Sequence, residues 1–159
     1  MRIGQGFDVH AFAPGRKLML GCVEVPHDLG LAGHSDADVM AHALCDALLG
    51  AASLGDIGQS FPDSDPRWKG AAGAELLRLV MEKVRVADFE LVNADVILMG
   101  EAPRIAPHKE KMTQAMARAL SVEPGQINVK ATTTEGLGFV GRKEGLAASA
   151  VVLLTHRKG

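Results

Sequence analysis

The stretch GQGFDVHAF, residues 4–12, predicts the first strand of a sheet and places two polar side chains on one of its faces. In an extended segment, residues i and i+2 project to the same side, so Asp8 and His10 point into one space and Val9 points away from it. A carboxylate and an imidazole that converge are either a polar strand edge or two ligands of a metal site. Strand geometry alone leaves both interpretations open.

The composition is that of a globular chain without a strong overall charge. Of the 159 residues, 47% are hydrophobic, and the formal net charge is −2. A chain of about 150 residues buries roughly 68–70% of its unfolded surface, so we expect a single domain over residues 1–159. The near-neutral charge provides no global field that would attract nucleic acid or an anionic membrane. Any phosphate site must therefore be local.

The cysteines and the apolar segments indicate where the chain resides. Cys22 and Cys45 lack the C-x-x-C spacing of a zinc or redox site, so we expect two small buried thiols in a reducing compartment. No segment has the roughly 18 apolar residues of a membrane span, and the N-terminus has no apolar signal core. We expect a cytoplasmic protein, or an organellar one whose transit peptide is absent, with no nucleic-acid or membrane partner.

Strands and helices alternate outward from the first strand. We expect a hairpin or bulged strand around Gly21 and an Ala- and Leu-rich helix from an N-cap at Ser35 or Asp36 to Gly50 or Gly55. Apolar spacing predicts further helices within residues 70–89 and 106–120 and further strands at 89–100, 127–133 and 146–157. The fold class is α/β (α+β): one domain, a mixed sheet of four to five strands, and helices on one face.

A third potential metal ligand lies in the first predicted helix. Asp38, His42 and Asp46 share one face at spacing i, i+4, i+8. Asp8, His10 and His42 could together hold Zn²⁺ with a fourth position open for water or substrate, as in catalytic sites. Alternatively, the histidines are ordinary hydrogen-bonded residues. Asp46 could hold the free ring nitrogen of His42, or it could be a solvated helix charge.

Two glycine-containing loops could bind phosphate. GHSDADV, residues 33–39, runs into a helix N-terminus, where free amides, His34 and Ser35 could bind an anion, although an ordinary helix cap fits equally. KATTTEGLGFVGRKEG, residues 130–145, combines hydroxyls, freed amides and Glu135, which could hold a second, oxygen-preferring divalent ion. The alternative for this stretch is a glycine-rich turn between strands.

A third loop, DIGQSFPDSDP at residues 56–66, carries carboxylates that could receive the hydroxyls of a polyol or simply be solvated turn residues. The chain contains no P-loop spacing, and GQG lacks the third glycine of a dinucleotide-binding fingerprint. The sequence therefore gives no support for a nucleoside-triphosphate or Rossmann site.

Taken together, GQGFDVHAF, GHSDADVMAHALCDALLGAASLGDIGQSFPDSDP and KATTTEGLGFVGRKEGLAA resemble the 2-C-methyl-D-erythritol 2,4-cyclodiphosphate synthases of the non-mevalonate isoprenoid pathway. The resemblance implies a lyase that converts 4-diphosphocytidyl-2-C-methyl-D-erythritol 2-phosphate to 2-C-methyl-D-erythritol 2,4-cyclodiphosphate and CMP. The 2-phosphate would attack the β-phosphorus of its own molecule without a protein nucleophile. The alternatives are a zinc-dependent phosphoester hydrolase and a non-catalytic nucleotide-binding module.

The resemblance also implies roles for individual residues. Asp8, His10 and His42 would hold Zn²⁺ or another divalent metal, and Glu135 would engage Mg²⁺ or Mn²⁺ bridging the substrate phosphates. His34 and Thr133 would be catalytic as transition-state stabilisers. The implied substrate-binding residues are Asp8, Val9, His10, His34, Ser35, Asp56, Ile57, Gly58, Phe61, Pro62, Asp63, Ser64, Asp65, Gly100, Glu101, Ala102, Pro103, Arg104, Ile105, Ala106, Thr132, Thr133, Thr134, Glu135, Phe139 and Arg142.

Within this set, residues 56–63 would take the methylerythritol group, and residues 100–107 with Thr132 and Thr133 would form the cytidine pocket. Arg104 stands where many members of the family have lysine, so the cation is kept and its reach changes.

The resemblance finally implies an assembly. The expected state is a homotrimer with each active site between two subunits. The strand LAASAVVLLT, residues 146–155, is apolar on both faces and needs cover on both, which fits a trimer or burial within one chain. By the same resemblance, Phe139, Arg142 and Glu144 would lie near the threefold axis, around a cavity where an isoprenoid diphosphate could bind.

Overall fold

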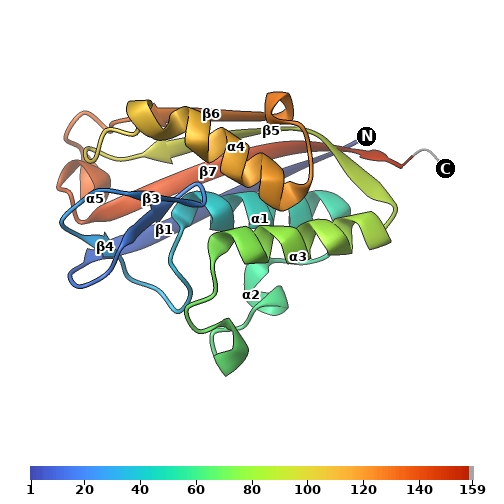
Figure 1. The fold of residues 1–159 in the computed structure, drawn as a ribbon, viewed down its shortest axis with the longest axis horizontal. Helices are drawn as coiled ribbons and strands as arrows, with labels where there is room; N and C mark the ends of the chain where they lie inside the picture. The colour runs from blue at the N-terminus through green and yellow to red at the C-terminus, as the bar shows by residue number, and fades with distance from the viewer. Residues whose placement is uncertain (158–159) are drawn as a thin grey trace.

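The computed structural model describes residues 1–157, which form one five-stranded sheet with three long helices on one of its faces (Figure 1). The strand order is β4-β1-β7-β5-β6, antiparallel except for the parallel pair β5 and β6. The strands are β1 (Arg2–Ala13), β4 (Gly30–Leu31), β5 (Phe89–Met99), β6 (Ile127–Thr132) and β7 (Gly145–His156). The expected mixed sheet is confirmed.

The three long helices match the predicted ones. They are α1 (Val39–Ala52), α3 (Gly73–Val86) and α4 (Lys109–Leu120). Helix α1 lies on β1, β7 and β5, α4 lies on β6, and α3 packs against both α1 and α4 (Figure 1). The helices therefore bury one face of the sheet, as predicted. Helix α4 makes the connection between the parallel strands β5 and β6.

Smaller elements fill the connections. The predicted hairpin is β2 (Leu18–Leu20) with β3 (Val23–Val25), and it forms a separate two-stranded sheet. Short helical turns that the sequence did not predict are α2 (Ile57–Ser60), α5 (Gly138–Gly141), and the 3-10 turns at Pro66–Trp68, Ala106–His108 and Pro124–Gln126. None of the described helices has both the length and the apolar character needed to span a membrane.

Helix α1 begins later than predicted. Its N-cap is Asp38, whose side chain accepts a hydrogen bond from Ala41 N, and not Ser35 or Asp36. Asp36 is occupied elsewhere, because its carboxylate accepts from Asp38 N and from Gly73 N at the start of α3. Asp38 also accepts from the hairpin amides of Gly21 and Cys22, so this buried carboxylate ties the hairpin to the helix. The amides of Gly21, Cys22 and Gly73 are distant in sequence, so local patterns could not show which aspartate each of them binds.

Two glycines of β1 let α1 lie directly on the strand. A Cβ atom on Gly4 would meet the carbonyl oxygen of Ala47, and one on Gly6 would meet that of Ala43. Both contacts would be with helix backbone, which cannot move aside as a flexible side chain would. The absence of side chains at these two positions brings the first turns of α1 beside the end of β1 that carries Asp8.

The opposite face of the sheet carries exposed apolar side chains on β1 and β7. Along β1, Gly4 and Gly6 face the helices, whereas Ile3, Phe7 and Val9 face outward with 75%, 57% and 40% of their surface exposed. Val151 of β7 is 45% exposed on the same side. The described chain covers the helix side of the last strand and leaves Val151 exposed on the other side, although this strand was predicted to need cover on both faces.

We predict that Gly6→Ala destabilises the fold by about 1–3 kcal/mol, because the added methyl group overpacks the contact with α1. Gly50→Ala is the matched control, because Gly50 lies in α1 with open space around its Cβ position, and alanine should stabilise that helix by up to about 1 kcal/mol. Thermal unfolding at equal protein concentration measures both. A Gly6→Ala variant as stable as the original chain would show that the strand and helix have room to separate.

Candidate active site

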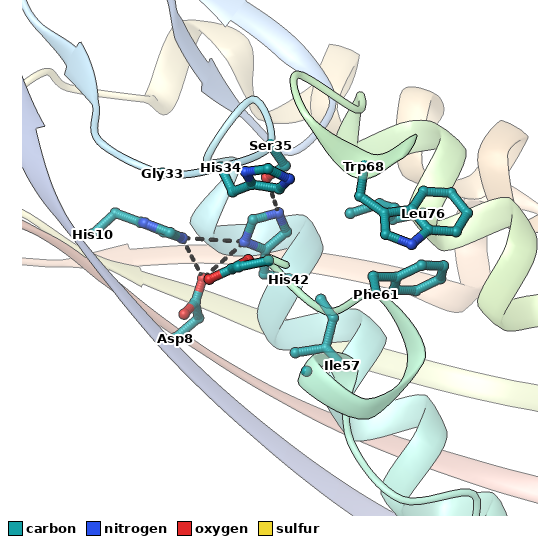
Figure 2. A pocket seen from close by; sticks show the side chains of 12 residues that line it. Asp8, His10, Gly33, His34, Ser35, His42, Ile57, Phe61, Trp68 and Leu76 are labelled. Carbon is teal, nitrogen blue, oxygen red and sulfur yellow. Dashed lines mark hydrogen bonds and ion pairs between the residues drawn. The ribbon is translucent and has the colours of Figure 1, made fainter. Parts of the chain in front are cut away.

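Three potential metal ligands converge where β1 and α1 meet (Figure 2). Asp8 Oδ2 lies 2.9 Å from His10 Nε2 and 3.1 Å from His42 Nδ1, and the two ring nitrogens lie 3.1 Å apart. Donor atoms bound tetrahedrally to one Zn²⁺ ion at about 2.1 Å stand roughly 3.4 Å from one another. The three side chains that the sequence singled out therefore fit around a single ion.

The outer nitrogen of each imidazole has its own partner. His10 Nδ1 lies 2.6 Å from the carbonyl oxygen of Ala32, to which it can only donate. His42 Nε2 lies 2.9 Å from Ser35 Oγ. With protons on these outer nitrogens, the lone pairs of His10 Nε2 and His42 Nδ1 point toward Asp8. Such partners fix ring orientation and tautomer in metal sites.

Charge in this cluster is concentrated on Asp8. Burial by itself would raise the pKa of Asp8, but when the inner ring nitrogens carry protons in place of a metal, hydrogen bonds from His10 and His42 and the charges of these residues lower the pKa to about 2. Burial would lower the pKa of His10, and the bond to Asp8 outweighs it, so the pKa of His10 is raised. Asp8 is therefore ionised at neutral pH, as a metal ligand must be.

The other two carboxylates on the predicted face of α1 serve the fold. Asp38 caps the helix, and Asp46 Oδ1 accepts a hydrogen bond from Ile57 N at 3.0 Å, where α2 begins. Asp46 is thus neither the partner of His42 nor a free solvated charge, the two roles considered from the sequence. Of the three residues at i, i+4, i+8 spacing, only His42 enters the metal-ligand group.

A pocket of about 240 Å³ opens above this group. Its polar end carries Asp8, His10 and His42, and its other end is formed by Phe61, Trp68 and Leu76 (Figure 2). The predicted site residues that line it are Asp8, His10, His34, Ser35, His42, Ile57, Gly58, Phe61 and Asp63. The pocket can accept a ligand with one anionic end and one apolar end.

Sequence reasoning missed three residues of this pocket. Gly33 is the first residue of the predicted phosphate loop but was not named as a site residue, Leu76 lies in the helix predicted within residues 70–89, and Trp68 stands two residues after the acidic loop. Trp68 was the detectable one, because it is the only tryptophan of the chain and stands beside a candidate site loop.

Several predicted residues lie outside the described pockets. Val9 faces the opposite side of the sheet, as the alternation of β1 requires. Asp56 caps α2 through Gln59 N, and Asp65 forms an ion pair with Arg67. Predicted residues absent from the pocket linings are Val9, Pro62, Ser64, Asp65, Asp56, Ala102, Thr134, Glu135, Phe139 and Arg142.

A second pocket, of about 460 Å³, gathers most of the predicted cytidine-binding residues at the ends of β5 and β6. The predicted residues in its lining are Gly100, Glu101, Pro103, Arg104, Ile105, Ala106, Thr132 and Thr133, and Lys109 adds a cation that the sequence had not singled out. Glu135 stands nearby, with Thr133 Oγ1 at 3.5 Å from its Oε1. Farther along the chain, α5 carries Phe139, and Arg142 pairs with Glu144.

The two pockets share no lining residue and lie on different strands. In the sheet, Asp8 of β1 aligns with Ala148 of β7, Leu98 of β5 and Ala131 of β6. Three strand spacings therefore separate the metal-ligand group from the Thr133 region, roughly 14 Å. Within one chain, the metal ligands and Glu135 do not form one continuous site.

The comparisons with known proteins agree with this geometry. The model of the YgbB family matches residues 1–155. A 2-C-methyl-D-erythritol 2,4-cyclodiphosphate synthase of Moorella thermoacetica is 59% identical over 99% of this chain and 97% of its own length.

Two solved structures share the fold. The bifunctional IspDF from Campylobacter jejuni matches with a TM-score of 0.95 and 47% identity over 99% of this chain, which spans 42% of that protein. A 2C-methyl-D-erythritol-2,4-cyclodiphosphate synthase in a CDP-bound form matches with a TM-score of 0.88 and 38% identity, over 97% of this chain and 100% of that one. The chain therefore belongs to the YgbB family, among the relatives of the 2-C-methyl-D-erythritol 2,4-cyclodiphosphate synthases.

Proposed function

We propose that the chain converts 4-diphosphocytidyl-2-C-methyl-D-erythritol 2-phosphate to 2-C-methyl-D-erythritol 2,4-cyclodiphosphate and CMP, as a cytoplasmic lyase of isoprenoid biosynthesis. The observation that carries this proposal is the convergence of Asp8, His10 and His42 at one end of a pocket, in a chain 59% identical to a synthase of that name. Two nitrogens and one carboxylate oxygen with an open fourth position are typical of a catalytic zinc site.

The chain holds two cations in this proposal. Asp8, His10 and His42 bind Zn²⁺, and Glu135 binds Mg²⁺ or Mn²⁺ together with the substrate phosphates. When bound, the ions supply Lewis-acid polarisation and neutralise phosphate charge. The hydrogen bonds that the outer ring nitrogens donate to Ala32 O and Ser35 Oγ support the zinc assignment, because they leave the inner nitrogens with free lone pairs.

The residues around the cations position the reacting phosphates. His34 and Ser35 line the polar end of the metal pocket, and Thr133 lines the second pocket, so each can hold phosphate oxygens. Because nucleophile and electrophile belong to one substrate, holding the two phosphates close supplies much of the rate enhancement. The second pocket, around Gly100–Ala106, receives the cytidine in this proposal, and the CDP-bound relative supports a cytidine nucleotide as the ligand.

A homotrimer completes the site in this proposal. The metal ligands and the Thr133 region lie on strands three spacings apart in one chain, so a substrate contacts both if a neighbouring chain supplies one of them. The open apolar face with Ile3, Phe7 and Val151 supplies the surface for that contact. A cavity near Phe139, Arg142 and Glu144 on the threefold axis, with an isoprenoid diphosphate as its ligand, belongs to the same proposal.

Two other functions share the metal site. A zinc-dependent phosphoester hydrolase would place water at the fourth position, and a nucleotide-binding module would bind CDP without turnover. The synthase is favoured, because relatives that align along 97% or more of this chain and of their own length bear that name.

We expect phosphorus NMR of the substrate, incubated with zinc- and magnesium-loaded protein, to show the coupled signals of a cyclic diphosphate as CMP appears. In ¹⁸O-labelled water the cyclic product should contain no label, because its new P–O bond uses a substrate oxygen. A labelled linear product would identify the hydrolase, and tight CDP binding without CMP release would identify the binding module.

We expect His42→Ala to lose bound zinc and to lower turnover by more than about 100-fold, since removal of a partner one shell farther out already costs 10–100-fold. His156→Ala is the control, because His156 is exposed at the far end of β7. Metal analysis after dialysis and a CMP-release assay measure both variants. Full activity of zinc-free His42→Ala protein would contradict the metal assignment.

Subunit mixing tests the shared site. We expect His42→Ala and Thr133→Val chains to be nearly inactive alone and to regain activity when they are unfolded, mixed and refolded together. Random mixing in a cyclic trimer makes about one quarter of the interfaces intact, so about a quarter of the original activity should return. Mixed chains that stay inactive, although they form hybrid trimers by native mass spectrometry, would place the whole site within one subunit.

A further inference from the structure

The side chain of Glu101 is directed at the backbone of the loop that carries Glu135. Its Oε1 accepts hydrogen bonds from Thr134 N at 3.1 Å and from Gly136 N at 3.3 Å. These two amides belong to the residues immediately before and after Glu135. One carboxylate oxygen of Glu101 therefore binds the backbone on both sides of Glu135, the residue that is proposed to hold the second cation.

The loop needs such support because of its backbone conformation. Glu135 has a φ of 54° and Gly136 a φ of 75°, both in the left-handed region. A residue with a side chain adopts this region at a cost, so it stays there when neighbouring groups hold it. The left-handed turn directs the amides of Thr134 and Gly136 to the same side, where Glu101 accepts from both.

The loop is packed from a second direction as well. A Cβ atom on Gly141 would meet the carbonyl group of Gly136, so α5 lies directly against the turn. Thr134 Oγ1 donates to Leu137 O at 2.7 Å, which closes the loop on itself. Glu101 supplies the contact to β5 that these local bonds lack, because it stands two residues after Met99, the last residue of that strand.

The negative charge of Glu101 favours a role in holding the loop over a direct contact with the ligand. A negative side chain in a pocket for a cytidine diphosphate repels the ligand phosphates, so a direct contact with them is unfavourable. An acceptor for two converging N–H groups is what the loop requires, and a carboxylate donates nothing that would compete.

We propose that Glu101 is a positioning residue, which fixes the backbone of Thr134–Gly136 and thereby directs Glu135 and Thr133 toward the substrate phosphates. The proposal rests on the proposed function for the identity of the substrate. Its structural part, that Glu101 holds the loop, stands on the two amide contacts alone.

Hydrogen exchange tests that structural part without turnover. In Glu101→Ala, the amides of Thr134 and Gly136 should exchange at least about tenfold faster, because they lose their common acceptor. Glu101→Gln keeps an acceptor oxygen and should preserve their protection. Glu110→Ala is the control, because Glu110 is an exposed acid on α4 whose side chain accepts a hydrogen bond from Gln114 and not from the loop. Unchanged protection in Glu101→Ala would overturn the proposal, whether or not the chain turns over the substrate.

Kinetics then separate positioning from direct substrate contact. Glu101→Ala should lower kcat by about 10–100-fold and should raise the Mg²⁺ concentration that gives the half-maximal rate. The KM for the substrate should change less than about threefold, and the zinc content of the protein should stay the same. Glu101→Gln should restore most of the rate. The Glu101→Ala, Glu135→Gln double variant should lose less rate than the product of the two single losses, since Glu101 acts partly through Glu135. A purely KM effect, equal defects in both Glu101 variants, or fully multiplicative losses would each contradict positioning.

If the unsubstituted chain releases no CMP from the substrate, the proposed function is wrong, and the kinetic measurements on the Glu101 variants cannot be made. The exchange rates still decide whether Glu101 holds the loop, so the two failures are distinguishable.

Discussion

The contact between β1 and α1 determines where the metal-ligand group forms. Asp8 and His10 belong to a strand and His42 to a helix, and side chains of this size meet within 3.1 Å only where the two backbones are close. Gly4 and Gly6 provide that closeness, because any side chain there would collide with helix carbonyls. Close packing at these two glycines thus sets the position of Asp8 and His10, which lie two and four residues after Gly6 on the same face of the strand.

The same contact makes the ligands rigid before a metal arrives. The first turn of α1 is anchored by Asp38 to the hairpin, and the preceding loop supplies Ser35 and Ala32 to the outer ring nitrogens. Asp8, held between the two imidazoles, stays ionised because its pKa is lowered to about 2. Ligands that already face one another lose little conformational freedom on binding, which favours tight and geometrically selective metal binding.

Local patterns in the sequence predict elements and faces but not the partners that fix them. Period-two alternation in residues 4–12 correctly placed Asp8 and His10 on one face, and helical spacing predicted all three long helices. Helical spacing also put Asp38 and Asp46 on the same face as His42. In the structure, however, Asp38 accepts hydrogen bonds from amides of the hairpin, and Asp46 accepts one from the first residue of α2. Such partners are set by tertiary contacts, as is the N-cap of α1, so no local pattern contains them.

The candidate site was predictable to different degrees. The metal ligands followed from residue chemistry once His42 was considered, whereas the roles of His34, Thr133 and the cytidine-pocket residues came from the resemblance to a family. One pocket is lined by Gly100, Glu101 and residues 103–106 together with Thr132 and Thr133, which is consistent with that set. Trp68 and Leu76 were missed because apolar residues at helical or turn positions look the same whether they line a core or a pocket.

The sheet itself supports the proposal that the active site is built from more than one chain. Strands β7 and β5 stand between the metal-ligand group and the Thr133 region, and hydrogen-bonded strands cannot be compressed to bring the two together. An apolar open face is also unfavourable in water. Packing such faces against one another removes the exposed apolar surface and, in the proposed trimer, sets the metal pocket of one chain beside the second pocket of its neighbour. Burial of this face and completion of the active site would then be a single event, so assembly and activity should be lost together when that face is made polar.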